Sequence, residues 1–386
     1  MNNSICFCCG SNNMENVLNL PKLPLTGYYV QKDETPIEAY HFDQCLLVCI
    51  DCGHGQLENI IDPQYLYNDK YSHRGSLSPI ASGGNYFFLK YLLANISGKK
   101  DSIIDIGCND LLLMQLIKDK VEAANYYGLD PIWIGKDYQN NGINVIGKFS
   151  DELSPNDIRG NLDLVVSCHT FEHIPNPLDS LKKISDLCSD NADFFIEVPS
   201  FETLTELNRI DQIFHQHVNY YSVNSMTELF NRFGFGYIDH TFNFNMWGGT
   251  MILHFKKGHI NLERSGAEKM TSQKFQYSLS MFKKQIDVFN EQIAFYQDVC
   301  LYGAAQMLPV LLYHIGNEKL NSAYIFDNNT NRIGLKYPYL DLHIQAPPAS
   351  LEGKAVVISA LDSYRSIFKR IIELNPRRVV DILNIN

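Results

Sequence analysis

Four cysteines in two closely spaced pairs are the residues whose type and spacing point most directly to a chemistry. Cys6 and Cys9 lie in CFCCG, and Cys49 and Cys52 lie in CIDCG. Two thiolates separated by two residues at a tight turn can bind one metal ion, and two such turns complete a tetrahedral shell of sulfurs. The spacing therefore predicts a structural Zn²⁺ site, whose closed shell leaves no position for a reactive water.

Two neighbouring cysteines leave the choice of ligands open. Cys8 and Cys45 each lie beside one of the pairs and could replace one of its members. The alternative to a metal site is a set of reduced, unliganded thiols. A glycine follows each pair, at Gly10 and Gly53, and this favours the tight turn of a zinc-binding knuckle.

A second group of residues lies at the ends of two predicted strands. The strand IIDIG ends at Gly107, and the next strand, YYGLD, ends at Asp130. A glycine turn after a strand lets the backbone approach a nucleotide-like ligand, and a carboxylate after the next strand can bind both ribose hydroxyls. Rossmann dehydrogenases share this arrangement but require G-x-G-x-x-G, whereas this chain continues from Gly107 through Asn109 to Leu111.

Alternating strands and helices must position these residues. Short apolar runs alternate with amphipathic helical segments, and the last two runs have no helix between them. This order predicts a parallel α/β sheet with an antiparallel hairpin at one edge. A helix before the hairpin should begin at its N-cap Ser222 and end at Gly234. The expected strands are 103–107, 126–130, 143–147, 162–168, 193–199, 235–242 and 248–255.

The chain divides into four predicted regions. Residues 1–65 contain the cysteine pairs and are too few for a large core, which indicates a module held together by metal. Residues 66–258 contain the α/β pattern described above. Residues 259–297 carry apolar side chains at helical spacing and are expected to form a helical linker. Residues 298–386 repeat the strand–helix alternation and predict a second, Rossmann-like α/β domain.

The stretch LVVSCHTFEHIPNP (164–177) resembles the fourth strand and following loop of S-adenosylmethionine-dependent methyltransferases. The chain as a whole resembles the sugar C-methyltransferases that act on TDP-4-keto-deoxysugars. The resemblance implies an α/β fold, in which a class I methyltransferase sheet is flanked by the zinc-binding module and a C-terminal Rossmann-like domain. The other motifs that carry it are IIDIGCNDLLL, YGLDP, DQIFHQHVNYYS (211–222), MWGGTMILHF (246–255) and VCLYGAAQMLPVLLYHIG (299–316).

The resemblance also implies a reaction, a cofactor and a set of site residues. A methyl group of S-adenosylmethionine would be transferred to the carbon beside a ketone of a nucleotide-linked sugar, after a base removes the α-proton. YGAAQ (302–306) would open a helix whose free N–H groups bind the diphosphate. The catalytic residues would be His217, His173 and Tyr71; the cofactor-binding residues Asp105, Gly107, Asn109, Asp130, Phe149 and His169; and the substrate-binding residues Phe214, Gln216, Trp247, Tyr302 and Gly303.

Several positions depart from the family pattern. Phe214 replaces a tyrosine, Gln216 replaces the glutamate that would orient or charge-stabilise the histidine, and Trp247 replaces a histidine. Leu111 replaces the third glycine of the cofactor turn. His173 has a second interpretation, because an EH(I/V)P loop is a structural turn in many methyltransferases. These changes keep two alternatives open: O- or N-methylation of a related sugar, and an inactive scaffold that only binds ligands.

Composition excludes other classes of function. The formal net charge of −11 argues against a surface that binds nucleic-acid phosphates. No apolar stretch approaches the roughly 20 residues needed to span a bilayer, and the N-terminus lacks the pattern of a signal peptide. We therefore expect a cytoplasmic protein, monomeric or homodimeric, whose partner is a small nucleotide-sugar substrate.

Overall fold

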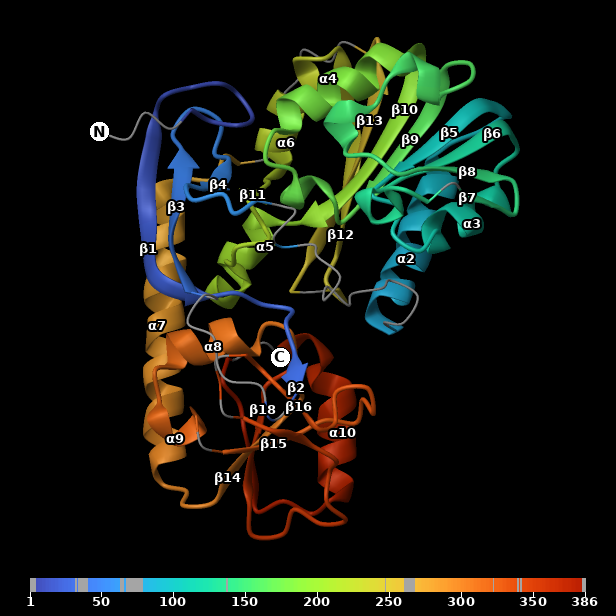
Figure 1. The fold of residues 1–386 in the computed structure, drawn as a ribbon. Helices are drawn as coiled ribbons and strands as arrows, with labels where there is room; N and C mark the ends of the chain where they lie inside the picture. The colour runs from blue at the N-terminus through green and yellow to red at the C-terminus, as the bar shows by residue number, and fades with distance from the viewer. Residues whose placement is uncertain are drawn as a thin grey trace.

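The computed structural model describes residues 5–31, 33, 41–62, 66, 79–136, 138–246, 248–259, 268–321, 323–338, 340 and 342–383. Two predicted site residues, Tyr71 and Trp247, lie outside these ranges. Figure 1 shows a large central sheet, a smaller N-terminal sheet beside it, and a C-terminal α/β unit below both. No helix in the described part of the chain combines the length and the apolar character needed to cross a membrane.

The central sheet has the strand order β12-β13-β10-β9-β5-β6-β8-β7. The strands from β10 to β8 are parallel, whereas β13 runs antiparallel to β10 and pairs with β12 as a hairpin. The predicted parallel sheet with an edge hairpin is therefore confirmed. Its strands are β5 (Lys100–Ile106), β6 (Ala123–Leu129), β7 (Tyr138–Asn140), β8 (Ile143–Ile146), β9 (Leu162–Cys168), β10 (Cys188–Pro199), β12 (Phe235–Asn243) and β13 (Thr250–Lys257).

Both faces of this sheet are covered by helices. Neighbouring residues on one strand face opposite sides, so Phe194 packs with α4 and α6 while Phe195 packs with α2 and α3. The helix α6 has Ser222 as its N-cap, which accepts a hydrogen bond from the Ser225 N–H, and Gly234 follows the helix with φ +78°, as predicted. The helices are α2 (Pro79–Asn95), α3 (Leu112–Lys118), α4 (Pro177–Leu187), α5 (Phe201–Glu206) and α6 (Val223–Asn231).

The N-terminal sheet contains a strand from the central part of the chain. Its order is β1 (Met14–Pro24), β3 (His41–Cys49), β4 (Gly55–Leu57) and β11 (Asn219–Tyr220), all antiparallel. A Cβ atom at Gly55 would lie 2.8 Å from the Phe201 ring and 2.9 Å from Tyr220 Cβ, so only glycine allows this approach. The sheet therefore continues from the cysteine-containing module into the α/β region predicted for residues 66–258.

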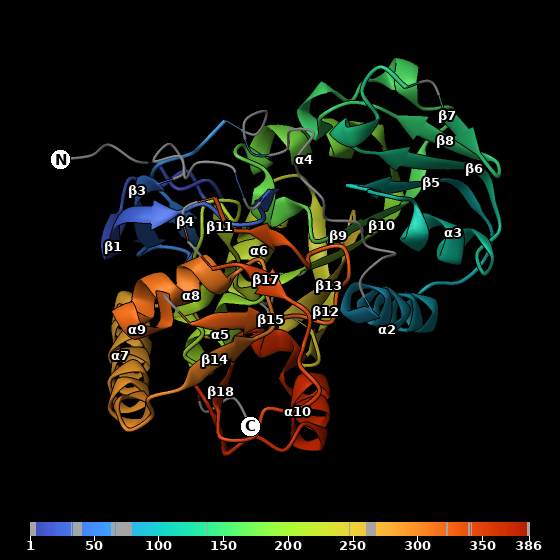
Figure 2. The ribbon, with the colours of Figure 1, turned by 60° about the horizontal axis from the view of Figure 1, so that its bottom comes forward.

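The C-terminal unit is a parallel sheet between helices (Figure 2). Its order is β17-β15-β14-β18-β19, with α7 and α8 packed on one face and α10 on the other. Sequence analysis missed β17, which is only two residues long. The elements are α7 (Ser272–Ala294), β14 (Val299–Tyr302), α8 (Leu308–Ile315), α9 (Glu318–Asn321), β15 (Tyr324–Phe326), β17 (Ile344–Gln345), β18 (Ala355–Ile358), α10 (Tyr364–Glu373) and β19 (Arg378–Val380).

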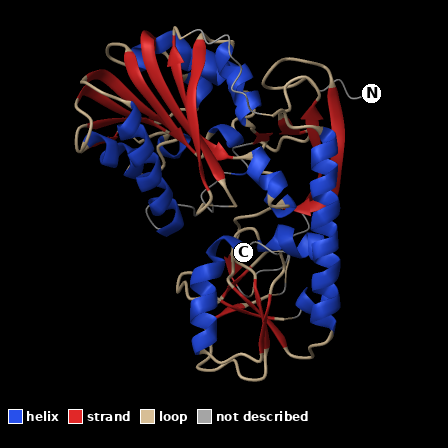
Figure 3. Cartoon of the chain, turned by 180° about the vertical axis from the view of Figure 1, so that it is seen from behind, coloured by secondary structure: helices blue, strands red, loops and turns tan. Residues whose placement is uncertain are grey.

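The helix α7 joins the N-terminal sheet to the C-terminal unit. Figure 3 shows it as a long helix that runs beside the N-terminal strands and continues beside the C-terminal sheet. Leu20 of β1, Phe282 of α7 and Leu301 of β14 belong to one apolar cluster. A short antiparallel pair, β2 (Val30–Gln31) with β16 (Leu335–Lys336), connects the same two units. The N-terminal module therefore shares its apolar core with the C-terminal unit.

The two cysteine pairs form matching turns that face each other. In each turn the glycine after the pair has a positive φ, +73° at Gly10 and +75° at Gly53, and its N–H donates to the carbonyl of the first cysteine at 2.9 Å. The Sγ atoms of Cys6 and Cys52 are 3.6 Å apart, as are those of Cys9 and Cys49. Sulfurs bound at about 2.3 Å to one tetrahedral zinc would be about 3.8 Å apart, so this donor set fits the ion.

The neighbouring cysteines lie outside this donor set. The Sγ atoms that lie within 4.8 Å of one another are those of Cys6, Cys9, Cys49 and Cys52. Cys45 Sγ instead donates to the side-chain oxygen of Asn19 at 3.0 Å. Cys8 is buried. The structure thus favours the four ligands that the CxxC spacing predicts.

We predict that protein purified without chelator contains one zinc per chain by elemental analysis. Cys9→Ser and Cys49→Ser should each lose the metal, whereas Cys45→Ser should keep it because that sulfur lies outside the cluster. Chelation should expose the knuckles to limited proteolysis before β1, since β1 packs against α7. Protein without stoichiometric zinc, or equal zinc loss in Cys45→Ser, would contradict the assignment.

Candidate functional site

A cavity of about 1240 Å³ opens where the three units meet. Its walls include Thr26 of the N-terminal module, Gly107 and His169 of the central sheet, and Tyr302 and Arg332 of the C-terminal unit. Gly107 and His169 directly follow the parallel strands β5 and β9. Ligands of open α/β sheets bind at the carboxyl ends of such strands, so the cavity lies where the fold predicts a site.

The turn after β5 requires glycine. Gly107 has φ +82°, and its N–H donates to the carbonyl of Leu129 at 2.7 Å. A Cβ atom at this position would lie 1.8 Å from Thr170 Oγ1, in the loop after β9. The turn after β5 and the loop after β9 therefore touch at a point where no side chain fits. At Gly107 the wall of the cavity is formed by backbone atoms.

Asp130 connects this turn to the next strand. One carboxylate oxygen accepts a hydrogen bond from the backbone N–H of Asn109 at 2.8 Å, and the other accepts from that of Ile132 at 2.9 Å. These two backbone N–H groups hold the carboxylate of Asp130 in the cavity wall. Asn109 and Asp130, predicted from strands that are separate in sequence, thus lie together in the cavity wall.

Asp105 is a buried carboxyl group on the same wall. Its Oδ1 has no hydrogen-bond partner among the residues that the structure describes. Burial, and then the negative charge of Asp130, raise its pKa to about 8. A buried, unpartnered oxygen of this kind fits a ligand that can form a hydrogen bond with it.

Leu111 does not narrow the cavity. It has φ +68°, the left-handed conformation that a glycine adopts readily, and its side chain lies in the apolar cluster with Phe88 and Met114. The side chain also packs against Gly128, where an added Cβ atom would meet it at 2.7 Å. The replacement of glycine at this position therefore leaves the backbone turn in place and directs the new side chain away from the site.

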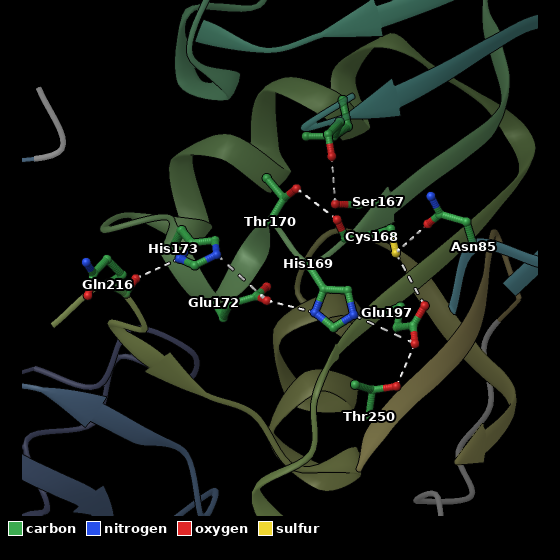
Figure 4. A network of polar contacts seen from close by, with 11 residues as sticks. Asn85, Ser167, Cys168, His169, Thr170, Glu172, His173, Glu197, Gln216 and Thr250 are labelled. Atoms are coloured by element: carbon green, nitrogen blue, oxygen red, sulfur yellow. Dashed lines mark hydrogen bonds and ion pairs between the residues drawn. The ribbon is translucent and has the colours of Figure 1, made fainter. Parts of the chain in front are cut away.

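Glu172 lies in the centre of a polar network after β9, and sequence analysis did not select it. A short 3₁₀ helix, Phe171–His173, brings its side chain between two histidines (Figure 4). Its Oε1 accepts a hydrogen bond from His169 Nδ1 at 3.2 Å and lies 3.9 Å from His173 Nε2. His169 Nε2 in turn lies 3.8 Å from the second carboxylate, Glu197.

His217 joins the network from the loop before β11. Its ring centroid lies 4.9 Å from that of His173 and 4.2 Å from that of Phe214. His173 Nδ1 donates to the carbonyl of Gln216 at 2.7 Å, and its Nε2 is the nitrogen that faces Glu172. One donor atom each from Glu172, His173 and His217 lies within 4.8 Å of the others, a set that a divalent cation could also use.

The residues of the network differ in their ionisation states. Burial, and then the charge of His173, lower the pKa of His217 well below its usual value, although Glu172 acts in the opposite direction. Burial would raise the pKa of Glu172, but the hydrogen bond from His169 and the charge of His173 lower it to about 2. Burial likewise opposes the charged form of His169, but bonds to Glu172 and Glu197 raise its pKa to about 9. Near pH 7 His217 is neutral, Glu172 anionic and His169 cationic.

Gln216 uses its amide to hold the N-terminal module. Its Nε2 donates to the carbonyl of Thr26 at 2.8 Å, and its Oε1 accepts from Thr26 Oγ1 at 3.0 Å. The residue lines the cavity, as predicted, but both ends of its amide are engaged in this contact. Gln216 therefore lacks the negative charge of a glutamate, and its neutral amide instead connects the loop before β11 to the N-terminal module.

The C-terminal end of the cavity differs from the predicted anion site. Gly303 has φ +103° and follows β14, but α8 begins only at Leu308. The N–H of Ala304 donates to Asp327 Oδ2 at 2.7 Å, so it is not a free helix N-terminal donor. The expectation that YGAAQ opens the helix is wrong, because Pro309 lies in its first turn and the chain before it forms a longer loop.

An arginine links the central and C-terminal units beside the cavity, and sequence analysis missed it. Arg209 is 3% exposed and binds Asp211 through Nε at 2.9 Å. Its Nη1 binds Asp362, in the loop after β18, at 3.0 Å. The sequence carried no local signal for this pair, because Arg209 and Asp362 are brought together only by the packing of the two units.

The cavity brings together every predicted cofactor, substrate and catalytic residue that the structure describes. Tyr71 and Trp247 lie outside the described ranges. The predicted residues in the cavity wall are Asp105, Gly107, Asn109, Asp130, Phe149, His169, His173, Phe214, Gln216, His217, Tyr302 and Gly303.

Comparison with known families assigns two regions of the chain. Residues 85–240 match a family described as "Methyltransferase domain", and residues 6–67 match one described as "Putative zinc binding domain". The C-methyltransferase NovU of Streptomyces niveus is 24% identical over 262 residues, which cover 64% of this chain and 59% of NovU. The chain thus matches less than two thirds of the length of this relative.

Solved methyltransferase structures resemble about half of the chain. The N-methyltransferase NodS of Bradyrhizobium japonicum, in complex with S-adenosylhomocysteine, has 12% identity and a TM-score of 0.38, covering 50% of this chain and 94% of NodS. The 1,6-didemethyltoxoflavin-N1-methyltransferase of Burkholderia thailandensis has 12% identity and a TM-score of 0.38, covering 54% of this chain and 98% of that enzyme.

The domain matches agree with the sheet order and with the cysteine cluster described above. They support the zinc-binding module and the methyltransferase sheet that the motifs indicate. The chain therefore joins an N-terminal zinc-binding domain to a class I S-adenosylmethionine-dependent methyltransferase domain.

Proposed function

We propose that this protein transfers a methyl group to the carbon beside the ketone of a nucleotide-linked deoxysugar, with His217 as the base. The observation that carries the proposal is the position of His217, a half-buried histidine on the wall of the cavity that also contains the Gly107 turn and Asp130. The similarity to a protein named as a C-methyltransferase supports carbon as the acceptor atom.

The residues at the carboxyl ends of β5 and β6 would hold the cofactor. S-adenosylmethionine, when bound, supplies an activated methyl group on a positively charged sulfur. Gly107 allows close approach of the backbone, and Asp130 would accept hydrogen bonds from the ribose hydroxyls. The unpartnered oxygen of Asp105 would accept from the donor groups of the same ligand.

His217 would remove the proton from the substrate carbon. A general base must be unprotonated at the working pH, and the lowered pKa of His217 satisfies this condition. His173 would bind the sugar through Nε2, because its Nδ1 is committed to the Gln216 carbonyl. Phe214 has no hydroxyl, so the negative charge that develops on the ketone oxygen must be stabilised by other donors of the wall.

The size and walls of the cavity suit a cofactor and a large substrate together. Sites for one small molecule usually measure about 300–1,000 Å³, and this cavity measures about 1240 Å³. The nucleotide diphosphate would lie toward the C-terminal unit, where Arg332 lines the wall next to Gly303. Arg332 is held there by the Ala304 carbonyl, at 2.9 Å, and by the ring of Tyr29, whose centroid lies 5.2 Å away.

O- or N-methylation is the second candidate. The replacements at Phe214 and Gln216 favour it, because they remove groups that would assist an enolate. The same neutral His217 could take a proton from a hydroxyl or an ammonium group. The two reactions differ in the position of the methyl group in the product, which mass spectrometry and NMR of the product determine.

We predict that Asp130→Ala weakens binding of S-adenosylmethionine by roughly 1.5–3 kcal/mol, because a charged hydrogen-bond partner is lost. Isothermal titration calorimetry measures this change. Asp130→Asn should weaken binding less, since an amide oxygen still accepts, and the exposed Asp119→Ala on the adjoining helix should leave binding unchanged. Equal affinities of wild type and Asp130→Ala would reject the assignment; a wild type that fails to bind would support the scaffold alternative.

We predict that the protein exchanges the α-hydrogen of a nucleotide-linked 4-keto-deoxysugar with deuterated water in the absence of the methyl donor. His217→Ala should reduce this exchange by about 10²-fold or more, the usual contribution of a general base. The exposed His259→Ala is the matched control. Normal exchange in His217→Ala would show that another group takes the proton, and methylation on oxygen or nitrogen would exclude the carbon acid.

We also predict that the acid limb of the kcat/KM profile lies below pH 6.5. A histidine base is active when neutral, and a lowered pKa keeps His217 neutral to a lower pH than a solvent-exposed histidine. Activity measured between pH 5 and 8 in buffers of constant ionic strength checks this. An acid limb at or above pH 6.5 would contradict the role of a buried, neutral histidine.

A further inference from the structure

We infer that Glu172 is the positioning residue of the proposed reaction: its buried carboxylate orients His173 and balances the charge that His217 acquires with the proton. Its carboxylate lies close to His217, whose sequence neighbour Gln216 carries no charge. This inference rests on the proposed function, because it assigns a partner to the proposed base. It concerns a residue of the EHIP loop to which neither the resemblance nor the similar proteins assign a role.

The position of Glu172 supports this role first. The residue is 1% exposed and lies between His169 and His173 (Figure 4). Its Oε1 faces both imidazoles, at 3.2 Å from His169 Nδ1 and 3.9 Å from His173 Nε2. Its Oε2 has no hydrogen-bond partner among the described residues. A buried carboxylate oxygen without a donor is costly, unless a proton-bearing group approaches it during the reaction.

The balance of charge in the network supports it second. Glu172 and Glu197 are two buried carboxylates, and the cationic His169 lies between them. Glu197 acts as an acceptor, from Thr250 Oγ1 at 2.5 Å and from Cys168 Sγ at 3.3 Å. One cation between two carboxylates leaves one negative charge uncompensated. When the substrate carbon gives its proton to His217, the positive charge that His217 acquires would neutralise this negative charge.

Among the residues that the structure describes, the cationic groups that act on Glu172 are all histidines. The titratable groups that face it are Cys168, His169 and His173 from the β9 loop, Glu197 from β10 through His169, His217 from the loop before β11, and the hydroxyl of Tyr221. Of these, Cys168, His169, His173 and His217 also line the cavity where the substrate would bind. Among them, His217 is the group proposed to take a proton from a ligand.

The decisive variant is Glu172→Gln, which keeps the shape and removes the charge. The histidine ring signals are titrated by NMR in zinc-loaded, full-length protein without substrate. The apparent pKa of His169 should fall from about 9, and the neutral form of His217 should persist to lower pH than in wild type. Glu206→Gln removes an exposed carboxylate outside the cavity and should change neither signal.

The second readout is the reaction itself. Glu172→Gln should slow α-hydrogen exchange by up to about tenfold for each unit by which the pKa of His217 falls, and should move the acid limb of the rate profile to lower pH. A residue that served only to pack the loop would lower the rate without moving the limb. Glu172→Asp, which keeps the charge, should recover part of the rate and is the variant to use if Glu172→Gln fails to fold.

These measurements separate this inference from the proposed function. If wild type exchanges no α-hydrogen but the histidine titrations shift in Glu172→Gln, the reaction is misassigned and the charge coupling stands. If the titrations of His169 and His217 are unchanged in folded Glu172→Gln, the inference is overturned whatever the activity. Stoichiometric Co²⁺ binding beyond the knuckle site that is lost in Glu172→Gln would also overturn it, because a metal would then occupy Glu172, His173 and His217.

Discussion

The pairing of β4 with β11 is the contact on which the arrangement of the site depends. Gln56 lies opposite Asn219 and Gly55 opposite Tyr220, and the Leu57 N–H donates to Val218 at 2.9 Å. These bonds begin one residue after His217 and so fix the loop that carries it. On the other side, Cys49 ends β3 and Cys52 lies in the turn between β3 and β4. The Phe7 N–H of the first knuckle donates to the Gln56 side chain at 2.9 Å. A metal at the knuckles therefore stabilises, through one short strand, the position of the proposed base.

The electrostatics of the site show that a carboxylate can be supplied from another part of the chain. A glutamate at position 216 would stand next to His217 in sequence, but Gln216 instead binds Thr26 and connects two units. Glu172, some forty residues earlier, lies near the same imidazole because the loop after β9 and the loop before β11 meet. The departure at Gln216, considered with the structure, therefore does not by itself argue for an inactive scaffold.

Sequence patterns predicted the features that depend on near neighbours. Gly10 and Gly53, Gly107, and the cap at Ser222 each follow from a turn or helix end a few residues long, and all were confirmed as structural elements. What could not be predicted depends on distant segments. Arg209 and Asp362 meet only through the packing of two units. The strand β11 joins the N-terminal sheet, whose first strand begins at Met14. The side chain of Leu111 packs in a cluster that includes residues of α2. The roles of the site residues stay predictions, since sequence and structure establish their positions only.

The shared apolar core fixes the relative positions of the units that line the cavity. The N-terminal strands, α7 and the C-terminal sheet belong to one apolar cluster, so none of them can shift without disturbing the others. Arg209 adds a polar connection across the cavity, because it is bound at once by Asp211 and by Asp362 of the C-terminal unit. A buried guanidinium without these partners would be strongly destabilising, so the pair favours one relative position of the two units. The proposed reaction needs a base held within hydrogen-bonding reach of the proton that it removes, so it requires that the two units keep this relative position.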